Sequence, residues 1–252
     1  MHYSRIFLAL SLWLAVGVLP VAPARAGTAE NCTSAPEFSV PDKKLVHLAD
    51  AVAGHDPIEI LAIGSGTTVG QDGGGGKAFP HRMIEALRAA LPEREIHLTL
   101  RGARGMTAAE MLKRIETEMA NNHFALVLWQ TGTVEAVRSI PADELRNTVQ
   151  TGIEQIRAQG SDLVLIDAQY TRAMAAKVDE TPYLRVLRQA AYMPGVVLFR
   201  RYDLMRSWAA EGRNDLENIR KADREKAVDA LHACLAYVLV RFVGDGAGIP
   251  IR

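Results

Sequence analysis

The sequence predicts a three-layer α/β/α sandwich built on a five-stranded parallel sheet. From residue 43 onward, short apolar runs alternate with segments of helical periodicity, which is the pattern of strands and helices that take turns along a chain. The strand-like runs are apolar throughout, so both faces of the sheet are expected to be covered. A glycine-punctuated segment at residues 64–70 follows the first run directly, and such sheets bind ligands at turns of this kind.

The predicted elements follow one another in a regular order. Apolar runs predict strands at residues 58–63, 95–100, 124–130, 162–167 and 196–200. Periodic segments predict helices at residues 43–53, 79–91, 107–121, 141–159, 182–193, 203–211 and 223–242. Thr107 followed by Glu110 fits a capping box, and Pro141 suits a first helical turn. No repeat or linker-like composition interrupts residues 58–252, so we expect them to form one globular domain.

The first 26 residues have the features of a secretory signal peptide. Arg5 precedes an apolar run from Ile6 to Val18, and Ala24-Arg25-Ala26 has the small-x-small pattern of a cleavage site. The run is short for a membrane span, and two prolines interrupt the sequence after it. We therefore expect cleavage near Ala26 and a periplasmic or secreted mature protein without a membrane span. Residues 27–57 would form an N-terminal arm and first helix packed on the domain.

Composition excludes some classes of partner. Hydrophobic residues make up 48% of the chain and charged residues 23%, as in ordinary globular proteins. Basic and acidic residues are balanced at 29 each, and loss of the leader would leave a net charge of about −2. Nucleic acid is therefore not an expected partner. The sequence leaves the oligomeric state open.

The chain contains two cysteines, Cys32 and Cys234. An exported protein meets an oxidising compartment, and two cysteines allow only one pairing. We expect a disulfide that ties the arm to the last helix. The alternative is that Cys234 is a buried small apolar residue and Cys32 a separate thiol.

Residues 73–77 resemble a phosphate-binding loop only superficially. The spacing Gly-x4-Gly-Lys is missing, and Ala78 stands where such a loop has serine or threonine. We interpret the run as a flexible surface loop over the strand ends. The histidines show no metal-ligand spacing, so neither a metal nor another cofactor is expected.

The turn after the first strand resembles a catalytic motif. Residues 64–70 read Gly-Ser-Gly-Thr-Thr-Val-Gly and are similar to the first motif of the SGNH (GDSL-like) hydrolases, Gly-Asp-Ser-x-x-x-Gly. Gly64 and Gly70 are in register, and Gly66 occupies the position of the family's nucleophilic serine. The resemblance implies the SGNH hydrolase fold, which is a flavodoxin-like sandwich, over residues 58–252. It also implies that the expected nucleophile is missing.

Two further segments resemble the motifs that bind the oxyanion in this family. Residues 101–107 are similar to Asn-x-Gly-x-x-Gly-x-Thr, in which Gly105 would donate its main-chain N–H. Residues 132–135 are similar to Gly-x-Asn-Asp, with Thr133 at the variable position and Glu135 at the aspartate. Val134 stands at the donor asparagine and has no hydrogen-bond donor in its side chain.

The family's final motif, Asp-x-x-His, fits the chain in two registers. In the first register, anchored on residues 232–236 as the start of the closing helix, Asp223 is retained and Lys226 replaces the general base. In the second, Asp229 and His232 form a literal Asp-x-x-His inside an apolar helical pattern. Helical geometry places that pair on one face, partly exposed beside the core.

Other polar residues lie at predicted strand ends. Residues 167–170, Asp-Ala-Gln-Tyr, follow the fourth strand and either line a pocket or form an Asp turn. Three arginines near the fifth strand either form a solvated face or pair with Glu135 and Asp223, and they are Arg200, Arg201 and Arg206. Glu135 and Asp223 are themselves candidates for an acid–base pair.

Three side chains that the family's chemistry requires are thus absent, at positions 66, 134 and 226. Ser65 and Thr67 flank the first of these positions, and the pattern favours turn roles for both, with Ser65 capping main-chain N–H groups. Loss of the nucleophile alone is usually enough to remove activity. We therefore expect an exported, catalytically degenerate hydrolase-fold protein. It would bind a small acyl or carbohydrate-like ligand or act as an envelope scaffold.

Two alternatives stay open. One is an atypical esterase or acyl hydrolase in which Ser65 is the nucleophile and Asp229 with His232 its partner. The other is a purely structural partner-binding protein, which would present a shallow cleft and an exposed apolar patch.

Overall fold

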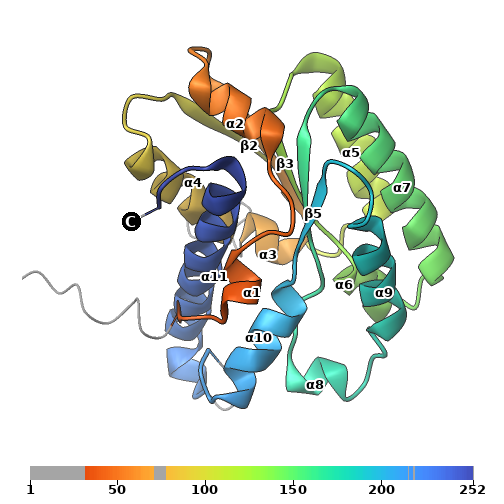
Figure 1. The fold of residues 1–252 in the computed structure, drawn as a ribbon. Helices are drawn as coiled ribbons and strands as arrows, with labels where there is room; N and C mark the ends of the chain where they lie inside the picture. The colour runs from red at the N-terminus through yellow and green to blue at the C-terminus, as the bar shows by residue number, and fades with distance from the viewer. Residues whose placement is uncertain (1–31, 71–77, 215, 218, 252) are drawn as a thin grey trace, which may run out of the picture.

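A computed structural model of the protein describes residues 32–70, 78–214, 216–217 and 219–251. The predicted leader, residues 1–26, and the glycine run at 73–77 lie outside these residues. A five-stranded sheet with the order β2-β1-β3-β4-β5 forms the centre of the fold (Figure 1). Its strands are β1 (Ile58–Gly64), β2 (Ile96–Gly102), β3 (Leu126–Gln130), β4 (Asp162–Ile166) and β5 (Val196–Phe199). All neighbouring strands are parallel, as the sequence predicts.

Helices cover both faces of this sheet. The longer ones are α2 (Val46–Ala53), α4 (Phe79–Ala90), α5 (Ala108–Asn121), α7 (Ala142–Ala158), α9 (Thr181–Ala190), α10 (Arg201–Ala210) and α11 (Arg224–Ala247). The short ones are α1 (Pro36–Ser39), α3 (Gly66–Val69), α6 (Thr133–Val137), α8 (Arg172–Ala175) and the 3-10 turn η2 (Lys221–Asp223). The short helices span a single turn or little more, and the sequence does not predict them because they contain too few residues for a periodic pattern.

Two apolar clusters hold the three layers together. Successive residues of a strand point to opposite faces, so Ile60 and Ala62 pack into one cluster while Leu61 and Ile63 pack into the other. The first cluster joins the sheet to α4 and α11, and the second joins it to α5, α7 and α9 (Figure 1). This arrangement confirms the predicted α/β/α sandwich.

Helix boundaries differ from the prediction where distant residues decide them. Helix α2 begins at Val46, because the Asp162 carboxylate at the start of β4 accepts a hydrogen bond from the Leu48 N–H at 2.9 Å. Helix α11 continues five residues beyond the predicted end and stops at Gly248, which has φ +71°. The predicted capping box is confirmed, since Thr107 and Glu110 exchange hydrogen bonds at the start of α5.

The N-terminal arm is fixed to the domain covalently. A disulfide joins Cys32 to Cys234 in α11, and each cysteine is only 3% exposed. Beside it, the indole N–H of Trp208 donates to the Thr33 carbonyl at 3.0 Å. Phe38 of α1 is buried in the first apolar cluster. The predicted pairing of the two cysteines is confirmed.

One stretch of the described chain, Lys221–Ala247, is long and apolar enough to cross a bilayer by length and composition. Of its most apolar window, 61% is buried inside the fold, against the sheet and α4. We interpret the stretch as the core helix of the first cluster.

Candidate functional site

The candidate site lies where the strand order reverses, at the carboxyl ends of β1 and β3. The chain leaves β1 at Gly64, passes Ser65 and enters α3 within one residue. This turn is tight, because a Cβ on Gly64 would stand 2.1 Å from Thr68 Oγ1. A glycine is therefore required at the first position of the motif for packing reasons.

Gln130, the last residue of β3, holds this turn in place. Its side-chain oxygen accepts from the Ser65 N–H and the Ser65 hydroxyl, both at 3.2 Å, and from the Thr68 hydroxyl at 2.9 Å. Thr67 Oγ1 lies 3.4 Å from the same oxygen and accepts from Arg201 Nη1 at 3.1 Å. Ser65 is 7% exposed and makes no capping hydrogen bond through its side chain. The predicted capping role of Ser65 is therefore wrong, because Gln130 engages its hydroxyl.

Gly66, at the position matched to the nucleophile, has no side chain, but the structure has space for a Cβ there. A Cβ on Gly66 would meet Arg104 Cα at 3.6 Å and Arg104 Cγ at 3.8 Å, which are ordinary van der Waals contacts. Packing therefore does not require a glycine here. The same contacts show that the loop after β2 lies against the turn after β1, as the matched motifs imply.

The two matched oxyanion positions differ from each other. Gly105 has φ +76°, a conformation that favours glycine, and a Cβ there would stand 2.9 Å from Arg138 Nη2. Val134 is half-buried near the start of α6 and offers no donor from its side chain. Thr133 is buried, and its hydroxyl oxygen accepts from the Gln169 N–H at 3.0 Å.

Glu135 holds two segments of the fold together through its buried carboxylate. It is 2% exposed, and its carboxylate accepts from the N–H groups of Ala108 at 2.6 Å and Gly132 at 2.9 Å and from the Thr131 hydroxyl at 3.3 Å. These bonds tie the start of α5 to the turn after β3. The alternatives in which Glu135 pairs with Asp223 or with the arginines near β5 are contradicted, because its partners are main-chain amides and a hydroxyl.

Both registers of the final motif fall at α11. Asp223 immediately precedes the helix and pairs with Arg220 at 2.6 Å, and Lys226 is exposed in the first helical turn. Asp229 and His232 lie within the helix, as their apolar surroundings predict. Asp229 forms an ion pair with Arg82 of α4.

His232 is buried against α4 at 8% exposure. Its Nδ1 accepts a hydrogen bond from the Phe79 N–H at 3.1 Å, and its ring stacks on that of Phe79. A neutral imidazole whose Nδ1 accepts carries its proton on Nε2, so neither nitrogen is free to take a proton. Burial, together with the positive charges of Arg201 and Arg82, lowers the pKa of His232 to about 4.

The carboxyl ends of the strands form the rim of the sheet. A buried cluster of charged side chains lies at this rim, after β4 and β5. Asp167, Glu180 and Arg201 are 0%, 3% and 1% exposed, and an oxygen or nitrogen of each lacks a hydrogen-bond partner within the described residues. Burial raises the pKa of Asp167 and of Glu180 to about 7 and lowers the pKa of Arg201 to about 10. Asp167 also accepts from the Tyr202 N–H at 2.7 Å. The sequence marks Asp167 and Arg201 as candidates but not Glu180, which lies in a polar run that resembles a turn.

The neighbouring arginines behave differently from Arg201. Arg200 and Arg206 both pair with Asp203, at 2.7 and 3.6 Å, and Arg188 joins them at 3.0 Å. Of the two alternatives for these arginines, pairing with Glu135 and Asp223 is contradicted, because the first turn of α10 supplies Asp203 as their carboxylate partner.

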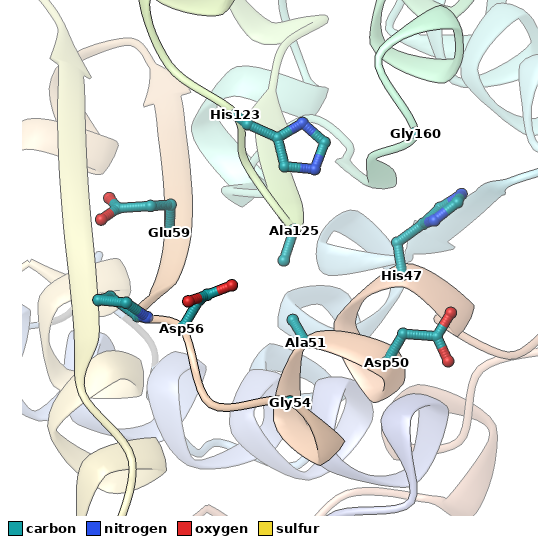
Figure 2. A pocket seen from close by; sticks show the side chains of 10 residues that line it. His47, Asp50, Ala51, Gly54, Asp56, Glu59, His123, Ala125 and Gly160 are labelled. Atoms are coloured by element: carbon teal, nitrogen blue, oxygen red, sulfur yellow. The ribbon is translucent and has the colours of Figure 1, made fainter.

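A separate hollow of about 310 Å³ lies at the other end of the strands, near the start of β1 and β3 (Figure 2). His47, Asp50, Asp56 and His123 line it, together with Glu59. Glu59 points away from the two imidazoles toward β2, where it contacts His97 at 2.6 Å. Within the residues that the structure describes, no group of three or more His, Cys, Asp or Glu side chains is arranged to hold a metal ion.

The fold, the strand order and the turn after β1 define the class: the protein has the SGNH (GDSL-like) hydrolase fold. More particularly, the chain belongs to the Non-GDSL lipase-like family, whose sequence model matches residues 31–249. The match begins in the arm, ahead of Cys32. No curated protein sequence matches the chain.

Solved structures with the same fold include an esterase and a lipolytic protein. Axe2, an acetylxylan esterase from Geobacillus stearothermophilus, has a TM-score of 0.60 at 18% identity, covering 79% of this chain and 98% of its own. A lipolytic protein of the G-D-S-L family from Veillonella parvula has a TM-score of 0.58 at 14% identity, covering 72% and 95%. TesA has a TM-score of 0.52 at 17% identity, covering 71% and 99%. At these identities the likeness concerns the fold.

Proposed function

We propose that this protein is an exported, non-hydrolytic member of the SGNH fold class that binds a small acyl or carbohydrate-like ligand at the carboxyl edge of its sheet. The observation that carries the proposal is the state of the turn after β1. Gly66 stands at the nucleophile position, and the adjacent hydroxyl of Ser65 is buried and bonded to Gln130. A hydroxyl without a neighbouring base attacks an ester very slowly.

The other catalytic positions support the same proposal. Val134 supplies no oxyanion donor from its side chain, and loss of one such donor typically costs about a hundred- to a thousandfold in rate. His232, the base of the alternative esterase hypothesis, already accepts from the Phe79 N–H. Lys226, the base in the first register, is an exposed helix residue. Without these catalytic groups, the carboxyl ends of the strands are suited to binding a ligand but not to cleaving an ester.

Ester hydrolysis tests the proposal. Purified mature protein would be assayed with p-nitrophenyl acetate and butyrate beside Ser65→Ala and His232→Ala. The controls are Ser39→Ala, at a half-buried position, and His123→Ala, at an exposed one. We expect no turnover above the buffer rate in any of the five proteins. Turnover that disappears in the Ser65 and His232 variants but persists in the controls would establish the atypical esterase instead.

Export is part of the proposal. The Cys32–Cys234 disulfide supports it, since structural disulfides persist mainly in oxidising compartments. Fractionation of cells that produce the full chain, followed by intact-mass measurement, tests it. We expect a periplasmic or secreted protein that starts at Gly27 and carries no free thiol. A full-length cytoplasmic protein with two reduced cysteines would contradict export.

A further inference from the structure

Two arginine side chains lie next to the two glycines that are matched to catalytic positions of the fold class. The Arg104 side chain lies against Gly66, with its Cγ 3.8 Å from where a Cβ of Gly66 would stand. Arg138 Nη2 stands 2.9 Å from the corresponding position on Gly105. The first glycine is matched to the nucleophile and the second to an oxyanion donor. Both arginine side chains therefore reach the part of the rim where a substrate of the fold class would react.

Neither guanidinium is engaged by the described part of the chain. No hydrogen bond or ion pair joins the side chain of Arg104 or Arg138 to another described residue. Arg101 and Arg146, by contrast, pair with Glu118 and Asp143. The charge of Arg138 acts on Glu110, whose Oε2 accepts from both the N–H and the hydroxyl of Thr107. The two exposed guanidinium groups thus keep their donors available.

We propose that Arg104 and Arg138 bind the negatively charged group of the ligand, a carboxylate or a phosphate, beside Gly66 and Gly105. Guanidinium groups donate paired hydrogen bonds that match the geometry of both oxyanions. An uncharged ester would gain little from two guanidinium groups, whereas an acidic sugar or an acyl phosphate would gain charge-assisted hydrogen bonds. The inference rests on the proposed function and specifies the ligand as anionic.

Paired ligands test this inference. The ¹⁵N-labelled mature protein would be titrated by NMR with glucuronate and with glucose, which differ by one carboxylate, and separately with inorganic phosphate. The same titrations would use the double variant Arg104→Gln, Arg138→Gln and the control Arg146→Gln, which removes an exposed arginine on α7. Each titration would be repeated at higher NaCl, because salt screens exposed charges.

We expect glucuronate or phosphate to bind at least about tenfold more tightly than glucose, with shifts at Gly66 and Gly105. The double variant should lose that preference and the control should keep it. A response to glucuronate alone would identify a carboxylate, and a response to phosphate alone would identify a phosphate. Binding of neither glucuronate nor phosphate more tightly than glucose, or unchanged anion binding in the double variant, would overturn the inference.

These outcomes are independent of the esterase assay. If the anion preference is absent while the p-nitrophenyl esters remain intact, the anionic ligand is wrong and the non-hydrolytic proposal stands. If the esters are hydrolysed through Ser65, the non-hydrolytic proposal itself fails.

Discussion

The side-chain oxygen of Gln130 lies 3.2 Å from both the main-chain nitrogen and the hydroxyl oxygen of Ser65. One residue at the end of β3 therefore holds the turn that follows β1, at the point where the strand order reverses. In this geometry the Ser65 hydroxyl serves the fold of the turn. Several consequences of this arrangement and of the buried charges around it are open to measurement.

Replacing Gln130 with leucine should loosen the turn. The change leaves the buried Ser65 N–H and the Thr68 hydroxyl without their acceptor, and each unsatisfied buried group typically costs about 1–3 kcal/mol. We expect a lower free energy of unfolding in urea and faster amide exchange at Ser65. Gln150→Leu is the matched control, because Gln150 is exposed on α7. Equal stability of the two variants would mean that the Gln130 bonds contribute nothing to the turn.

Serine should be tolerated at Gly66 without restoring hydrolysis. A Cβ at this position makes only ordinary contacts with Arg104, so we expect a stability change within about 1 kcal/mol. The new hydroxyl would still lack a base and the side-chain oxyanion donor, so p-nitrophenyl acetate should remain intact.

Gly64→Ser is the steric control for that variant. Its Cβ would stand 2.1 Å from Thr68 Oγ1 and 2.9 Å from Gln130 Oε1, and overpacking of this kind typically costs about 1–3 kcal/mol. Thermal unfolding should therefore separate the two serine variants clearly. A Gly66 variant as unstable as the Gly64 variant would contradict the open space described at the nucleophile position.

The free energy of unfolding should rise with pH because the pKa of His232 is lowered in the folded state. Its folded pKa of about 4 lies below the ordinary value of 6.5, so between these pH values the unfolded chain binds a proton that the folded chain does not. The free energy of unfolding should therefore increase from pH 4 to pH 6.5, by up to about 3 kcal/mol from this residue. His232→Gln, whose amide oxygen can still accept from Phe79, should lose this rise in urea titrations. His123→Gln, at an exposed position, should keep it.

Asp167 should have the opposite effect, lowering the free energy of unfolding as the pH rises. Its folded pKa of about 7 lies above the ordinary 3.8, so the folded state retains a proton that the unfolded chain has released. Stability from this group is full below pH 3.8 and declines as pH rises toward 7. Asp167→Asn removes the titration, and its oxygen can still accept from the Tyr202 N–H. The variant should gain stability relative to wild type between pH 5 and pH 8, and Asp143→Asn, exposed on α7, should not.

The sequence predicts the architecture well because the architecture follows from local patterns. Apolar runs and periodic segments identify the five strands and seven longer helices, and Thr107 with Glu110 marks the start of α5. The motif around Gly64 also carries the fold class, since its spacing reflects the tight turn.

The site was less predictable because its contacts join residues far apart in the chain. Gln130 is a strand-end polar residue by pattern, and its bonds to the turn at Ser65 span 65 residues. Arg200 and Arg201 are adjacent and look alike in the sequence. Packing of α10 turns Arg201 into the interior beside Asp167 and leaves Arg200 outside on Asp203. Such assignments require the tertiary structure.

The disulfide has a consequence for how the chain is made. Cys32 is synthesised 202 residues before Cys234, so the bridge cannot close until nearly the whole polypeptide has emerged from the ribosome. During that interval the early thiol stays available to oxidants and to other thiols. The covalent bond can therefore form only after α11 has been synthesised, so it secures the arm as a late event in the making of the protein.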